Sequence, residues 1–113
     1  MKTRLTKEQS DHLLSLGCTF PNNLAIQDNN KDFYVRIELA DLLEILPKEL
    51  MFDKEHGLDF GWDFYENKWF ARYSDEDSIC VYENAWYLDK ELIDALYQLA
   101  CWYYGEYLKS EGK

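Results

Sequence analysis

The chain has 113 residues, the length of one ordinary domain, so residues 1–113 are expected to fold as a single unit. It carries 22 acidic and 12 basic residues, a formal net charge of −10, and 17% of its residues are aromatic. That aromatic content excludes an intrinsically disordered chain. The shortage of Lys and Arg argues against direct binding to nucleic acid. What remains is an acidic, soluble, globular domain.

The first predicted element is a helix over residues 6–16. Thr6 and Gln9 have the spacing of a capping box, in which each side chain bonds the backbone N–H of the other residue. Gly17 is placed to end the helix in a left-handed conformation. Its start and its end are therefore both marked in the sequence.

In the middle of the chain the spacing of the apolar residues changes twice, from irregular to alternating and then to helical. Residues 18–32 are rich in Pro, Asn and Asp, which predicts irregular chain with room for a short strand at 24–26. Apolar residues alternate over 33–37, which predicts a strand. A second helix follows, with apolar positions at Leu39, Leu42, Leu43 and Leu46. Pro47 either stops this helix or opens a further turn through Leu50.

A hairpin is the clearest feature of the second half. Residues 58–64 alternate strictly, and a tight turn at Asn67-Lys68 leads into a second strand at 69–73. The alternation assigns Trp62 and Phe64 to the core. A third strand is predicted at 78–82.

The last predicted element is a helix over about residues 89–108, with Asp89 as its N-cap. Its apolar stripe is wide enough for a helix that lies across a sheet, and Gly105 is expected to fray or bend the last turn. The element order favours an α+β fold: a small antiparallel sheet of three to four strands with about three helices packed mainly on one face.

Three stretches carry a resemblance: residues 5–9, residues 40–50, and residues 91–97 with their continuation to Leu108. Together they resemble small proteins of unknown function that are carried on bacterial prophages and conjugative elements. The resemblance implies a mobile-element accessory protein in a bacterial cytoplasm. It implies no catalytic residue, because its motifs are helix-packing patterns.

The cysteines indicate a reducing compartment. Cys18, Cys80 and Cys101 are odd in number and have no CxxC spacing, so they form no disulfide framework. No signal peptide is expected, because charged residues follow the first basic ones at once. The least polar stretch, Ala95–Gly105, is too short to span a bilayer. A cytoplasmic location without membrane binding is the expectation.

Metal, cofactor and nucleophile sites lack sequence support. His12 is expected on a solvated helix flank and His56 in a surface loop, and neither has metal-ligand spacing. The acidic segments 28–32 and 75–77 fail the pattern of a calcium loop. No cofactor and no metal are therefore expected. A cysteine that meets a histidine in space stays open as an unlikely catalytic alternative.

The candidate site residues are aromatic and acidic. Trp and Tyr are favoured as interface anchors, and 19 aromatic residues are many for one core. The predicted partner-binding residues are Tyr65, Trp69, Tyr73, Trp102, Asp59 and Asp63. Asp59 and Asp63 share a strand face. This arrangement favours two polar residues on the solvent-exposed face of the strand over a carboxylate pair for acid–base catalysis.

The leading hypothesis is a non-enzymatic protein-interaction module that binds a protein partner or a second copy of itself. Residues 53–113 hold 14 acids and 6 bases, while residues 1–52 hold 8 acids and 6 bases. This skew supports a second hypothesis, an acidic mimic of nucleic acid that inhibits a host DNA-binding protein or nuclease. A small enzyme using Cys or His is the third.

Overall fold

The computed structural model describes residues 1–20, 25–27, 30–75 and 81–111. Strands β3, β4 and β5 form one antiparallel sheet in that order, and β1 and β2 form a separate antiparallel pair. The fold is therefore α+β, as the element order predicts. The elements in chain order are α1 (Lys7–Ser15), β1 (Ala25–Gln27), β2 (Phe33–Val35), α2 (Leu39–Ile45), β3 (Gly57–Asp63), β4 (Lys68–Ser74), β5 (Val81–Asp89), α3 (Leu92–Trp102), the π-helical turn η1 (Tyr103–Tyr107) and α4 (Leu108–Glu111).

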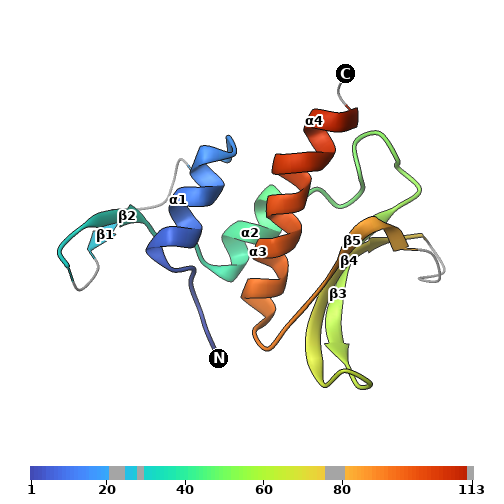
Figure 1. Cartoon of the computed structure of the whole chain (residues 1–113), viewed down its shortest axis with the longest axis horizontal. Coiled ribbons are helices and arrows are strands. Elements are labelled where there is room, and N and C mark those ends of the chain that lie inside the picture. Colours follow the sequence, from blue (N-terminus) through green and yellow to red (C-terminus); the bar gives the residue numbers. More distant parts are fainter. Residues whose placement is uncertain (21–24, 28–29, 76–80, 112–113) are drawn as a thin grey trace.

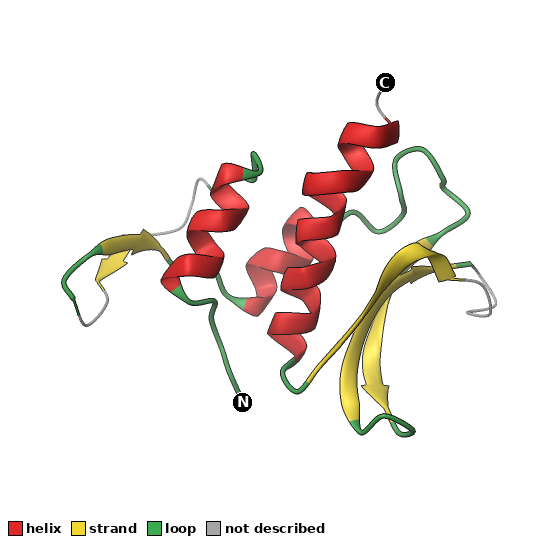
Figure 2. Ribbon diagram, in the orientation of Figure 1, coloured by secondary structure: helices red, strands yellow, loops and turns green. Residues whose placement is uncertain are grey.

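The elements are layered around one long helix, which α3, η1 and α4 form in continuation. The three-stranded sheet lies on one side of this helix, and α1 and α2 lie on the other (Figure 1). The β1–β2 pair lies beyond α1, at the end of the molecule away from the sheet (Figure 2). The helix is consequently apolar almost all round, as a helix packed from two sides must be. Its buried residues are Leu92, Ile93, Ala95, Leu96, Leu99, Ala100, Trp102, Tyr103 and Tyr107.

The first helix begins as its sequence predicts. Thr6 Oγ1 accepts a hydrogen bond from Gln9 N at 3.2 Å, and Thr6 N donates to Gln9 Oε1 at 3.0 Å, which completes the capping box. Gly17 follows the helix with φ +99°, a conformation that strains any residue with a Cβ. Gln9 Nε2 and Lys2 Nζ both donate to Asp94 Oδ1, at 3.0 and 2.7 Å, and so fasten this end of α1 to α3.

An aromatic cluster fills the space between the long helix and the sheet. Tyr73 of β4 lies 6.1 Å from the ring of Trp102 and 6.3 Å from that of Tyr103. Tyr82 of β5 contacts Trp102 edge-on at 5.7 Å, and Tyr107 stacks on Tyr103 at 5.4 Å. Trp102 lies just before the π turn, and Tyr103 and Tyr107 are its first and last residues; all three are buried.

The hydroxyls of this cluster hold the loop between α2 and β3. Tyr73 donates to the carbonyl of Pro47 at 2.8 Å. Tyr107 donates to Asp53 Oδ2 at 2.8 Å and accepts from the backbone N–H of Phe52 at 2.9 Å. The buried hydroxyls of Tyr73 and Tyr107 thus both have partners, as a dry environment requires.

The largest differences from the predicted boundaries lie where β5 meets α3 and where β5 begins. Asp89 is the last residue of β5 rather than the N-cap of the last helix, which begins at Leu92 with Glu91 as its N-cap. Asp89 still accepts from Glu91 N at 3.1 Å. The third strand runs from Val81 to Asp89, so the predicted strand 78–82 overlaps only its start, and residues 78–80 lie outside the described residues. Sequence period alone does not mark where a strand passes directly into a helix.

Alkaline pH is expected to destabilise the fold. Burial raises the pKa of Tyr104 to about 12 and raises the pKa of Tyr73 and of Tyr97 above the ordinary value of 10.0. Between about pH 10 and 12, therefore, the folded chain keeps protons that the unfolded chain has lost. The free energy of unfolding should fall there by about 1.4 kcal/mol per pH unit for each such tyrosine. Urea unfolding at increasing pH, followed by circular dichroism, measures this; a free energy that stays level above about pH 10 contradicts it.

Candidate interaction surface

The β3–β4 hairpin has one apolar face and one polar face. Its register pairs Leu58 with Tyr73, Phe60 with Ala71, and Trp62 with Trp69 on the face that turns toward the helices. The long helix packs on β4 and β5, and Ala71 and Tyr73 are fully buried beneath it. Strand β3 lies at the edge of the sheet, beyond the helix. Its apolar face is therefore only partly covered.

Three aromatic residues that the alternation assigns to an inward face are exposed, two on this strand and the third in the turn that follows it. Phe60 is 40% exposed, Trp62 37% and Phe64 86%. The prediction that Trp62 and Phe64 belong to the core is wrong, although the alternation itself is correct. Strict alternation looks the same on an edge strand as on a central one, so the sequence contains no signal that separates the two.

A four-residue turn presents the tip of the hairpin to solvent. Asp63 Oδ1 accepts from the backbone N–H of Tyr65 at 2.9 Å and from that of Glu66 at 3.1 Å. Asn67 closes the turn with φ +58°, a conformation that Asn tolerates better than most residues. Tyr65, at the tip, is completely exposed. The predicted turn at Asn67-Lys68 is thus longer than expected, and Lys68 already belongs to β4.

The polar face of the hairpin is stiffened by one chain of contacts. Arg72 donates from Nε to Asp59 Oδ2 at 2.9 Å, and its guanidinium lies 4.8 Å from the centre of the Phe70 ring. Phe70 in turn covers Gly61, where an added Cβ would lie 3.4 Å from the ring. Asp59 and Asp63 share this face, as their spacing predicts. Asp59 forms an ion pair with Arg72, and Asp63 accepts the hydrogen bonds that stabilise the turn.

The structure divides the predicted partner-binding residues into two groups. Tyr65 is exposed, and Trp69 is half-buried with its ring edge-on to Trp62 at 5.4 Å. Tyr73 is 0% exposed and Trp102 is 6% exposed. Their assignment to a partner surface is wrong, because both pack into the aromatic cluster under the long helix. We define the hairpin surface as the aromatic side chains of the apolar face and the tip that lie outside this cluster: Phe60, Trp62, Phe64, Tyr65 and Trp69.

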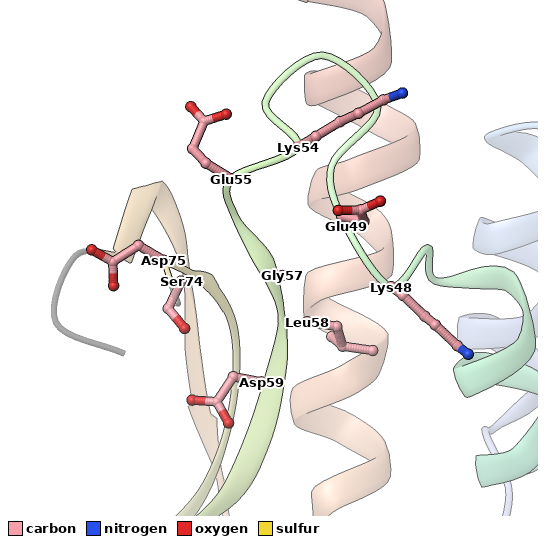
Figure 3. A pocket seen from close by; sticks show the side chains of 9 residues that line it. All are labelled: Lys48, Glu49, Lys54, Glu55, Gly57, Leu58, Asp59, Ser74 and Asp75. Atoms are coloured by element: carbon pink, nitrogen blue, oxygen red, sulfur yellow. The ribbon is translucent and has the colours of Figure 1, made fainter. Parts of the chain in front are cut away.

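An open hollow of about 500 Å³ adjoins the first residues of β3. The carboxylates of Glu55, Asp59 and Asp75 lie on one side of the strand, and Lys48 and Lys54 point to the other (Figure 3). Within the described ranges, no group of three or more His, Cys, Asp or Glu side chains is placed to hold a metal ion. The lining residues are Lys48, Glu49, Lys54, Glu55, Gly57, Leu58, Asp59, Ser74 and Asp75.

Both His12 and Cys101 line a second groove, of about 390 Å³. Burial raises the pKa of the Cys101 thiol and outweighs a hydrogen bond with Tyr97, which lowers it. Burial also raises the pKa of Cys18 to about 11. An attacking thiolate needs a lowered pKa, so the raised pKa of these two thiols argues against a nucleophilic role for them. Cys80 lies outside the described residues.

The two histidines differ in their surroundings. His12 is exposed on α1, as predicted. His56, predicted in a surface loop, has a side chain only 17% exposed and lies edge-on to the Tyr82 ring at 5.3 Å. The backbone N–H of Leu50 donates to the His56 carbonyl at 3.0 Å, which joins the two ends of this loop.

Comparison of the chain with protein-family models, with curated proteins and with solved structures finds no match. Every helix in the described part of the chain is too short or too polar to traverse a bilayer. The function is therefore inferred from the residues and their geometry.

Truncation should separate the core aromatics from the surface ones. Tyr73→Ala or Trp102→Ala should cost about 3–5 kcal/mol of unfolding free energy, because each leaves a cavity in the aromatic cluster. Tyr65→Ala should change it by about 0.5 kcal/mol or less, since the side chain touches solvent only. Denaturant unfolding monitored by fluorescence measures all three. Equal losses for Tyr65→Ala and Tyr73→Ala would show that the hairpin tip is packed after all.

Proposed function

We propose that the protein is a non-enzymatic interaction module that binds another protein chain through the hairpin surface. The observation that carries the proposal is the exposure of four large aromatic side chains, Phe60, Trp62, Phe64 and Tyr65, on one hairpin. Clustered exposed apolar side chains mark interaction sites, and Trp and Tyr dominate binding energy where they occur. The stiff polar face supports the proposal, because a rigid hairpin loses little conformational entropy on binding.

The charge of the chain supports an apolar rather than an electrostatic contact. Between residues 57 and 74 the hairpin has three acids and two bases, against a net charge of −10 for the whole chain. The acidic surface lies elsewhere and favours solubility. In keeping with the sequence resemblance, we propose a cytoplasmic accessory protein of a bacterial mobile element.

Removal of the aromatic tip should abolish partner capture. Phe64→Ser combined with Tyr65→Ser should reduce recovery of bound protein from a bacterial lysate about tenfold or more, because it deletes two exposed anchors. Capture should persist at high salt, since salt screens charges and not apolar contacts. Affinity capture at about 0.05 M and about 0.5 M salt, read by mass spectrometry, measures both effects.

The matched control is Phe33→Ser on β2, which removes a 68% exposed aromatic side chain from the opposite end of the molecule. It should leave capture unchanged. A partner that is lost at high salt and is still bound by the hairpin variant would contradict the proposal, and would favour an acidic surface that mimics nucleic acid.

A further inference from the structure

The outer edge of β3, opposite β4, is bounded at its two ends and open between them. At its first residues, Leu58 N donates to the Lys48 carbonyl at 2.8 Å, and Glu49 pairs with Gly57, so a piece of loop covers the edge there. At its last residue the chain turns into the hairpin tip. Between these limits, no other segment of the described chain pairs with β3 on this side. Residues 59–63 therefore form a short open edge.

The direction of the backbone groups follows from that one bond. Backbone N–H and C=O groups alternate between the two edges of a strand. Because Leu58 N points to the outer edge, the N–H and C=O of Phe60 and of Trp62 point there as well. The same two residues carry the partly exposed aromatic rings. Unpaired backbone groups and uncovered apolar rings thus coincide, which is the combination that invites another strand.

We propose that the occupant of this edge is β3 of a second copy, paired antiparallel about a two-fold axis at Gly61. This inference rests on the proposed function and assigns one part of the hairpin surface, Phe60 and Trp62, to a second copy. In this arrangement Phe60 exchanges both backbone hydrogen bonds with Trp62 of the second copy, and their rings meet on the apolar face. Gly61 lies opposite Gly61 of the second copy at the closest approach of the two strands. The two sheets become one of six strands.

The neighbouring residues select this register. A pairing centred on Phe60 would put Trp62 of the second copy beside Leu58, where Lys48 already lies. A pairing centred on Trp62 would bring in Phe64, which belongs to the turn rather than to the strand. The Gly61-centred register is the one that uses the full open edge and meets neither obstacle.

Charge on the opposite face permits the approach of two acidic copies. The register brings Asp59 opposite Asp63 of the second copy, which would cost energy between bare carboxylates. Asp59, however, is bound by Arg72 at 2.9 Å, and Asp63 has Lys68 as its cross-strand neighbour. Each of the two carboxylates therefore has a cationic side chain beside it, which reduces their repulsion. The remaining repulsion between two chains of −10 charge acts at longer range and is screened by salt.

Sedimentation of the purified full chain over a concentration series tests the proposal. We expect a monomer–dimer equilibrium that tightens as salt rises from about 0.02 M to about 0.5 M. Phe60→Pro should weaken the dimer at least about tenfold, because it removes an outward N–H and an aromatic ring. It breaks no bond to β4, since that N–H points away from it. Phe33→Ala, a more exposed phenylalanine on β2, should leave the equilibrium unchanged.

Cysteine cross-linking provides a second test of the pairing in case circular dichroism shows that Phe60→Pro is unfolded. Gly61→Cys should form a disulfide-linked dimer under mild oxidation, because the axis brings the two residues within bonding distance. Asp59→Cys, two residues away and off the axis, should not link to itself. Mass spectrometry of the linked peptides identifies the bond apart from the native cysteines.

The failure of this inference differs from the failure of the proposed function. A chain that stays monomeric at about 1 mM, or a dimer that Phe60→Pro leaves intact together with equal linking by both cysteine variants, overturns pairing through β3. If that monomer still captures a different protein through the hairpin surface, the interaction module stands and only its partner is wrong. If no protein is captured either, both proposals fall.

Discussion

The burial of one long apolar helix is the constraint on which the rest of the structure depends. The helix that starts at Leu92 is too apolar to face water on either side, so it needs a cover on both. The three-stranded sheet supplies one cover, and α1 and α2 supply the other. Polar contacts between residues far apart in the chain orient these covers. Asp94 receives Gln9 and Lys2 from the N-terminal segment, and Tyr107 holds the loop that leads into β3.

The hairpin surface is a consequence of how far that helix reaches. A helix is about 10 Å across, and neighbouring strands lie about 4.8 Å apart. One helix therefore covers two strands well and a third only at its margin. The uncovered strand is β3, whose apolar residues continue the inward face of β4 without a helix above them. Aromatic exposure on this strand is thus built into the geometry of the core.

The opposite face of the hairpin explains why the exposed strand keeps its shape. Edge strands tend to fray or to twist away, since one side lacks hydrogen bonds. Here Gly61 leaves room for the Phe70 ring, and Arg72 lies over that ring while it binds Asp59. These contacts hold β3 to β4 from the polar side. The same ion pair reduces the charge of the one region where an acidic chain exposes its aromatic residues.

The sequence by itself determined the local structure. The capping box at Thr6, the left-handed Gly17 and the strict alternation in β3 all depend on neighbouring residues, and short-range physics is enough to predict them. Only the tertiary structure decided which aromatic side chains lie on the surface and which are buried. Tyr73 and Trp62 have the same alternating environment along the chain, yet one is fully buried and the other is 37% exposed. Their difference lies in the strand order and in the path of the helix, and both depend on contacts between residues far apart in the chain.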